Sequence, residues 1–132
     1  MEILRCANIV PLLPRSTTED VLVDGTVIPK DTIIAMINEE VMKGSYWQEG
    51  QTFNPERFLN IVTDERFIPF GIGKRICPGK NLANMQLFLY FTRILQLFNI
   101  YPETAGVMPK EGVIPGLSSS PMPFKLKFSA RK

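Results

Sequence analysis

The chain has 132 residues, of which 45% are hydrophobic, and this is enough for one modest domain with a core. The net charge is only +2 and no basic block is present, so the composition does not indicate nucleic-acid binding. Two cysteines and no histidine exclude an ordinary zinc site formed within the chain and argue against a disulfide framework, which suits a reducing, intracellular compartment. No signal peptide, membrane-spanning helix or amphipathic anchor is evident.

The first residues predict a short helix. Glu2 and Arg5 are three positions apart and therefore share one helix face, where a carboxylate and a guanidinium can pair. Taken alone, such a pair is most often a surface salt bridge of small value. Cys6 has no distinctive context, and we interpret it as a small core residue.

Two segments then predict β-structure. Residues 21–28 predict a hairpin, because Asp24-Gly25 is a favoured turn between two runs rich in β-branched residues. Residues 32–37 predict a further strand. Trp47 and the sequence around Pro55 lie in an irregular, proline-containing stretch.

Residues 81–98 predict a long helix with apolar side chains on more than one face, which favours deep burial. Its apolar stretch is too short to span a membrane and is interrupted by Arg93. The spaced apolar residues are Ala83, Leu87, Phe91, Ile94 and Phe98 on one face and Leu82, Met85 and Leu89 on another.

After residue 100, proline, glycine and serine predict loops around one or two short strands. Residues 124–128 alternate apolar and basic side chains, which predicts a half-exposed strand.

Residues 70–79 carry the most specific pattern in the chain, Phe-x-x-Gly-x-Arg-x-Cys-x-Gly, with Cys77 as its cysteine. From average residue usage, a chance match is expected about once in ten million positions. A lone cysteine is usually a small buried hydrophobe and a lone arginine a solvated charge, but their combination at this spacing favours a ligand site. Pro78 suits the first turn of the following helix, whose amides and dipole would stabilise a thiolate.

This pattern resembles the haem-thiolate loop of the cytochrome P450 family. The resemblance extends over nearly the whole chain and implies a mainly α fold with small β-sheets, of which residues 1–132 form the C-terminal part of a single domain. It also implies that Cys77 is the axial ligand of a haem iron. Further haem-binding residues implied by the resemblance are Phe70, Gly71, Gly73, Arg75 and Gly79, with Arg75 binding a propionate.

Other positions acquire meaning from the same resemblance. Arg15 is the candidate for a second propionate contact, and an ordinary exposed arginine is the alternative. Glu2, Arg5 and Arg57, the last from Pro55-Glu56-Arg57-Phe58, are expected to form a buried network that holds the cysteine loop in place. No catalytic residue is assigned, because the family's distal helix with its acid–threonine pair has no counterpart in these residues.

The implied activity is a haem-thiolate monooxygenase that inserts one atom of O₂ into a small apolar substrate, with electrons from NADPH through a reductase. Lys74, Arg75 and Lys80 form a basic face that would meet this reductase, or else a merely solvated surface. By resemblance, membrane attachment at the endoplasmic reticulum would come only through an N-terminal anchor of a longer, microsomal protein.

Two alternatives remain open. The first alternative is a truncated haem-binding remnant without catalysis. The second is a member of the same family that rearranges peroxides and needs no reductase. These residues cannot cover every apolar face of the helix at 81–98, so we expect the isolated chain to aggregate or stay partly unfolded.

Overall fold

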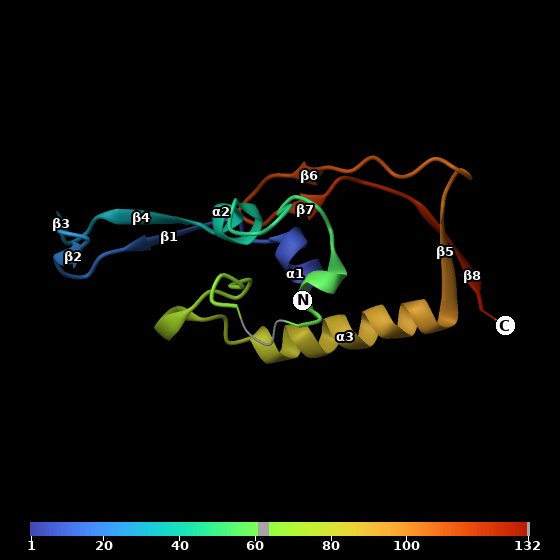
Figure 1. Cartoon of the computed structure of the whole chain (residues 1–132), viewed down its shortest axis with the longest axis horizontal. Helices are drawn as coiled ribbons and strands as arrows, with labels where there is room; N and C mark the ends of the chain where they lie inside the picture. The colour runs from blue at the N-terminus through green and yellow to red at the C-terminus, as the bar shows by residue number, and fades with distance from the viewer. Residues whose placement is uncertain (61–63, 132) are drawn as a thin grey trace. The chain divides into compact units, whose positions relative to one another are not determined.

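The computed structural model describes residues 1–60 and 64–131, which form two compact units (Figure 1). The first contains residues 1–69 and 115–119, and the second contains the remaining residues from 70 onward. Helices alternate with small two-stranded sheets, in agreement with the predicted fold class. That residues 1–132 belong to one domain stays a prediction.

The first unit begins with α1 (Glu2–Ala7), which ends at Asn8 in the left-handed conformation, with φ 38° and ψ 56°. Asparagine tolerates this conformation, and its N–H donates to the carbonyl of Leu4 at 3.2 Å. This short helix carries both Glu2 and Arg5, which are buried.

Two antiparallel strand pairs follow. The pair β2 (Val21–Val23) and β3 (Thr26–Ile28) confirms the predicted hairpin. Its turn residues Asp24 and Gly25 both have positive φ, at 47° and 80°, as the tight hairpin turn requires.

The predicted strand at 32–37 is confirmed as β4 (Ile33–Ile37), but its partner β1 (Leu12–Ser16) was not predicted. Pro14 lies in the middle of β1 and cannot donate to a ladder, so the sequence gives only a weak strand signal there. The strand β1 has a single hydrogen-bonded neighbour, which leaves a free side where a proline is tolerated.

The helix α2 (Asn38–Lys43) follows β4 without a loop and was also not predicted. It has six residues and no side-chain cap, so its pattern is too short to detect. Met42 and Trp47 are the buried apolar residues of the described chain, and the 3-10 helix η1 (Pro55–Phe58) contributes Phe58 beside Trp47. The ring centroids of Trp47 and Phe58 are 5.7 Å apart.

The second unit is built on α3 (Lys80–Leu97), which confirms the long helix predicted at 81–98. The chain leaves it directly as β5 (Phe98–Pro102), which pairs antiparallel with β8 (Leu126–Ala130). The strand predicted at 124–128 is therefore present but lies two residues later, in register with β5. A second ribbon joins β6 (Val113–Ile114) to β7 (Ser120–Pro121).

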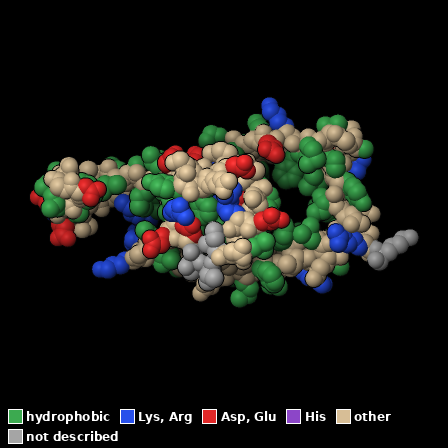
Figure 2. All heavy atoms as spheres, in the orientation of Figure 1, with side chains coloured by type: hydrophobic (Ala, Val, Ile, Leu, Met, Phe, Trp, Pro, Cys, Tyr) green, Lys and Arg blue, Asp and Glu red, His purple; other side chains and the backbone are tan. Residues whose placement is uncertain are grey.

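The predicted deep burial of α3 is wrong within these residues. None of its side chains is buried, and Met85 and Phe88 are 59% and 68% exposed. Figure 2 shows apolar side chains on the surface over this helix. The narrow ribbons β5–β8 and β6–β7 present too little surface to cover a helix that is apolar on several faces.

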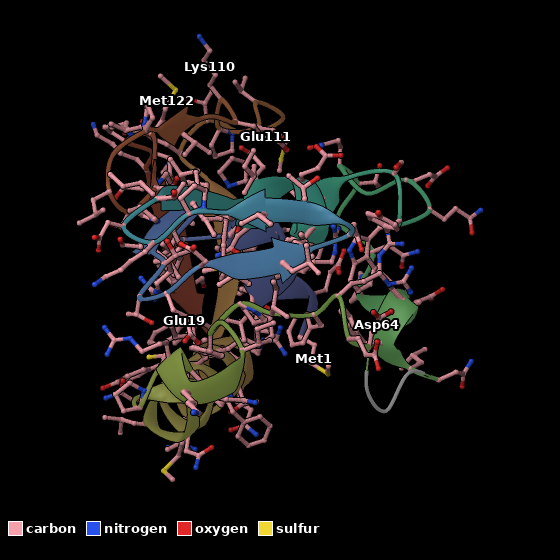
Figure 3. All side chains as sticks on the ribbon, turned by 90° about the vertical axis from the view of Figure 1, so that its left-hand side faces the viewer. Met1, Glu19, Asp64, Lys110, Glu111 and Met122 are labelled. Atoms are coloured by element: carbon pink, nitrogen blue, oxygen red, sulfur yellow. The ribbon has the colours of Figure 1, made fainter. Side chains whose placement is uncertain are left out.

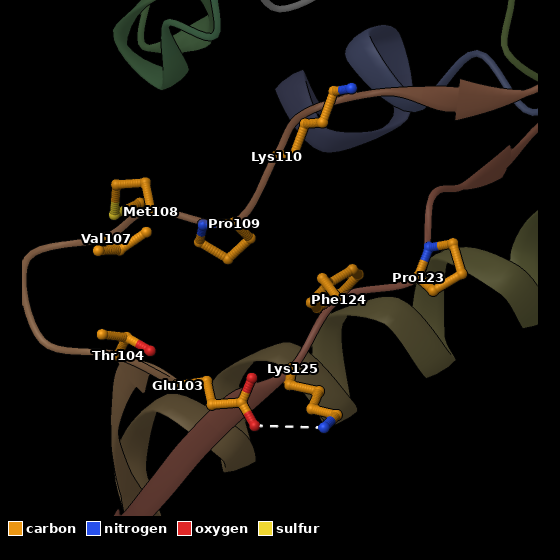
Figure 4. Close-up of a pocket in the computed structure, with 9 residues that line it drawn as sticks. All are labelled: Glu103, Thr104, Val107, Met108, Pro109, Lys110, Pro123, Phe124 and Lys125. Atoms are coloured by element: carbon orange, nitrogen blue, oxygen red, sulfur yellow. Dashed lines mark ion pairs between the residues drawn. The ribbon is translucent and has the colours of Figure 1, made fainter.

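A hollow of about 690 Å³ lies in the second unit, between residues 103–110 and 123–125 (Figure 4). Glu103 and Lys125 form an ion pair of 3.3 Å at its edge. None of the predicted site residues lines it. Among the residues that the structure describes, no helix is long and apolar enough to cross a membrane.

Candidate functional site

The loop around Cys77 is closed by its own backbone. The N–H of Cys77 donates to the carbonyl of Phe70 at 2.9 Å, so the two ends of the pattern meet. Gly71 and Gly73 lie in the left-handed region, with φ 74° and 66°. A side chain would be strained at both positions, which explains why glycine is needed in this loop.

The short 3-10 helix η2 (Gly73–Arg75) begins at the second of these glycines and ends two residues before the cysteine. The N–H of Ile76 donates to the carbonyl of Gly73 at 3.1 Å, and this bond sets the turn that leads into Cys77. The loop conformation is thus determined by local hydrogen bonds and two left-handed glycines.

At the end of the loop, the expected place of Pro78 in the first turn of the helix is wrong. Gly79 has φ −82°, so it does not use the left-handed region; it is the N-cap residue of α3. Pro78 therefore precedes the cap and lies outside the first helical turn. The carbonyl of Cys77 accepts from Lys80 N–H at 3.3 Å, and this tight turn delays the start of the helix.

The thiol of Cys77 is free and exposed. Arg75, two residues before it, is also exposed, and Ile72 and Ile76 are 67% and 42% exposed. Phe70 is half-buried. An accessible soft sulfur ligand beside apolar side chains and a guanidinium is a donor set that fits an iron porphyrin with acidic side groups. A cofactor of this kind is compatible with the loop as it stands.

Lys74 and Arg75 within this loop, and Lys80 at the start of α3 directly after it, are all exposed. Arg15, the other predicted propionate ligand, is half-buried on β1, and its Nη1 donates to the carbonyl of Pro14 at 2.9 Å. Its role stays a prediction.

Glu2 and Arg5 form a bidentate ion pair in the first unit. Arg5 Nε donates to Glu2 Oε2 at 2.7 Å and Arg5 Nη2 to Glu2 Oε1 at 2.8 Å. The Arg5 side chain is fully buried, and its remaining N–H groups donate to backbone carbonyls of Met42, Gly50 and Thr52. The bonds to these carbonyls tie α1 to the end of α2 and to the segment that follows it.

Arg57 joins the same carboxylate from η1. Its Nε lies 3.6 Å from Glu2 Oε1, and its Nη1 donates to the carbonyl of Gln48 at 2.6 Å. The backbone N–H of Asn54 donates to Glu2 Oε1 at 2.9 Å. The structure therefore brings Glu2, Arg5 and Arg57 together, and it adds a backbone donor that the sequence did not indicate.

These contacts determine the ionisation of the group. Burial on its own would raise the pKa of Glu2, but the hydrogen bonds from Arg5 and Asn54 and the charge of Arg5 outweigh it and lower the pKa to about 2. Burial also raises the pKa of the neighbouring Cys6 thiol, which donates to Glu2 Oε1 at 3.5 Å. Cys6 is half-buried at the edge of the network, where we had predicted a core residue.

Trp47 lies at the centre of this cluster, and sequence reasoning missed its role. The guanidinium carbons of Arg5, Arg57 and Arg66 lie 5.3, 5.8 and 5.5 Å from the centre of its ring. Asp64, labelled in Figure 3, pairs with Arg66 at 2.6 Å. The single tryptophan with arginines before and after it was the available signal, but no regular spacing connects them.

The family model described as Cytochrome P450 matches residues 1–128. Farnesoate epoxidase of Bombyx mori is 39% identical over all of this chain and 28% of the relative's own length. Cytochrome P450 2D28 of Mesocricetus auratus is 39% identical over 95% of the chain and 26% of its own length, and Cytochrome P450 2B2 of Rattus norvegicus is 36% identical over 98% and 28%.

The chain thus spans about a quarter of the length of these curated relatives. The family match includes the Glu2 network, the loop at 70–79 and all of α3. On this evidence the chain belongs to the cytochrome P450 family.

Proposed function

We propose that the protein binds haem through the thiolate of Cys77 and acts as a monooxygenase that inserts one oxygen atom from O₂ into a small apolar substrate. The observation that carries this proposal is the exposed Cys77 thiol, in a loop closed onto Phe70, within a chain that matches the P450 family. A thiolate-ligated haem supplies electron density that favours cleavage of a bound O–O bond. The residues of this chain hold and orient that group.

Each of the proposed haem-binding residues has a separate task. Gly71 and Gly73 combine left-handed backbone with the absence of a side chain, so a flat macrocycle can approach the backbone closely. Arg75 is exposed and offers a forked donor to a propionate, and Arg15 is the candidate for a second contact. Phe70 packs near the ring in this proposal.

The cluster of Glu2, Arg5 and Arg57 has a structural task. Its members are buried or nearly so and are committed to one another and to backbone carbonyls, so none is free to act on a substrate. We infer that it maintains the fold of the first unit and thereby the position from which the cysteine loop starts.

The electron donor is proposed to be an NADPH-dependent reductase with an acidic docking surface. Exposed Lys74, Arg75 and Lys80 supply positive charge beside the ligand loop and would steer such a partner. For a eukaryotic microsomal parent, this meeting would take place at the endoplasmic reticulum membrane.

The substrate class rests on the relatives. The name of the Bombyx mori relative describes an epoxidase that acts on farnesoate. We propose an apolar organic substrate for this protein by analogy with that relative, at the level of class alone.

For the 132 residues by themselves, haem binding without turnover is the second candidate function. The uncovered α3 supports it, because a helix that is apolar on several faces and buried on none lacks the packing that would enclose a substrate. This second candidate function predicts that the haem-loaded chain forms no oxygenated product when a reductase and NADPH are supplied.

The ligand assignment is tested by titrating ferric haem into the chain in mild non-ionic detergent and recording the Soret band and the electron paramagnetic resonance signal. Wild type and Cys6→Ser are expected to give the same low-spin thiolate signal, and Cys77→Ser is expected to lose it. The same signal in Cys77→Ser, or its loss in Cys6→Ser alone, would assign the iron to another group.

A further inference from the structure

Arg66 contacts Trp47, but the proposed function gives this arginine no role. It comes from the irregular segment at 64–69, while Arg5 comes from α1 and Arg57 from η1. Three cations converge on one ring, each with its guanidinium carbon within 6 Å of the centre. This distance is that of cation–π contacts.

Three positive charges at one ring need compensation. Glu2 pairs with both Arg5 and Arg57, whereas Asp64 pairs with Arg66 alone, so two carboxylates face the three guanidinium groups. Asp64 is only 8% exposed and accepts from Nε and Nη2 of Arg66 at 2.8 and 2.6 Å, which is a bidentate pair. These two bonds orient the plane of the Arg66 guanidinium beside the ring, while the Arg66 side chain is 45% exposed.

A third contact fixes Arg66 to the residue before the tryptophan. Its Nη1 donates to the carbonyl of Tyr46 at 3.1 Å. Phe67, the next residue, packs edge-on against Phe58 with ring centroids 5.1 Å apart, and Phe58 packs on Trp47. Residues 64–67 are thus held to the cluster through both a charged and an apolar side chain.

We propose that Arg66 is a positioning residue, which by clamping onto Trp47 anchors the last stretch of chain before the cysteine loop. Arg66 is four residues before Phe70, whose carbonyl closes that loop on Cys77. The functional meaning of this anchor rests on the proposed role of Cys77, but the anchor itself does not depend on haem.

The test uses the fact that Trp47 is the single tryptophan of the chain. In a Cys6→Ser background, Cys77 is the single cysteine and can carry a fluorescent acceptor. Energy transfer from Trp47 to this label then reports the position of the loop without haem, in mild detergent. Acrylamide quenching of the unlabelled protein reports how accessible the Trp47 side chain is to solvent.

Arg66→Gln removes the positive charge, and the resulting local opening is expected to increase the acrylamide quenching constant of Trp47 roughly twofold. The same variant is expected to show a lower efficiency of energy transfer and a broader distribution of distances between Trp47 and the label. Arg66→Lys keeps a cation that can lie over the ring and is expected to retain most of the transfer. The matched control is Arg93→Gln on α3, an exposed arginine whose loss changes the net charge equally. This control is expected to leave both signals unchanged.

Unchanged quenching in Arg66→Gln would show that no clamp exists, and increased quenching with unchanged transfer would show that the clamp does not position the loop. Trp47 emission equal to that of the urea-unfolded chain would overturn the proposal as well, because Arg66 would then act on global stability. If the wild-type chain does not bind haem, the proposed function is contradicted. The fluorescence measurements are made without haem, so they still decide whether the clamp exists.

Discussion

Arg5 holds Glu2 by two parallel hydrogen bonds, Nε to Oε2 at 2.7 Å and Nη2 to Oε1 at 2.8 Å, in a site where the arginine is fully buried. The pair is bidentate, and every other N–H direction of the guanidinium is used by a backbone carbonyl or by Cys6. Such a pair is costly to break because either partner alone would be a buried, uncompensated charge.

Replacement of this arginine is therefore expected to destabilise the first unit. Arg5→Ala leaves the Glu2 carboxylate buried and three backbone carbonyls without a donor, and the expected loss is about 3–5 kcal/mol of unfolding free energy. Urea denaturation followed by Trp47 fluorescence measures it. Arg93→Ala on α3 is the control, and an equal midpoint for Arg5→Ala and this control would contradict the structural role.

The same pair predicts a pH dependence. The pKa of Glu2 is lowered from 4.5 to about 2 in the folded chain, so its stabilisation is complete above pH 4.5 and is lost as the pH falls towards 2. A shift of this size corresponds to about 3 kcal/mol. Glu2→Gln is expected to be less stable at neutral pH and to show a flatter stability curve in this acidic range.

Trp47 emission in urea, measured at several pH values, compares the two proteins. The pKa of Asp64 is also lowered, chiefly by its hydrogen bonds with Arg66, but Asp64 is present in both, so the difference isolates Glu2. Parallel stability curves for wild type and Glu2→Gln below pH 4.5 would show that Glu2 is not the group that titrates.

Gly73 and Gly79 make different demands on the loop. Gly73 has φ 66° and an alanine Cβ there would meet no atom within 4 Å, so Gly73→Ala adds backbone strain without a clash, at about 1–2 kcal/mol. We expect haem affinity to fall roughly tenfold, which equals about 1.4 kcal/mol. Gly79→Ala, at φ −82° with Cys77 Sγ at an ordinary 3.7 Å, is expected to bind nearly as wild type. Equal losses in the two variants would contradict this account.

The uncovered α3 predicts self-association of the isolated chain. Leu82, Met85 and Phe88 are each more than half exposed, and a contiguous apolar surface of this kind associates in water. Sedimentation velocity without detergent is expected to show large species for wild type and smaller ones for Leu82→Gln/Met85→Gln/Phe88→Gln. Asn84→Gln is the polar control on the same helix. A cooperative thermal transition of soluble, monomeric wild type would contradict the prediction.

The elements with strong local signals were predictable from the sequence. The Asp24-Gly25 hairpin has turn residues that take positive φ readily, and the helix at 80–97 has a long apolar repeat. The strand β1 was not predicted because Pro14 interrupts the strand pattern in its sequence. This strand exists through its pairing with β4. Propensity carries no information on such a partner.

The candidate site was predictable to a similar degree. Cys77 and the two left-handed glycines follow from one dense pattern, and the Glu2 network follows from three groups in a family order. Arg66 and Trp47 could not be paired from the sequence, since their contact arises from tertiary packing of an irregular segment with no periodicity. The position of Pro78 was wrong because a tight turn after Cys77 delays the helix.

The central claim, that Cys77 binds haem iron as a thiolate, is tested most directly by the absorption spectrum of the haem-loaded chain after reduction and exposure to carbon monoxide. A strongly red-shifted Soret band is expected for wild type and for Cys6→Ser, and its absence is expected for Cys77→Ser. The same red-shifted band in Cys77→Ser, or none in wild type that has bound haem, would contradict the assignment.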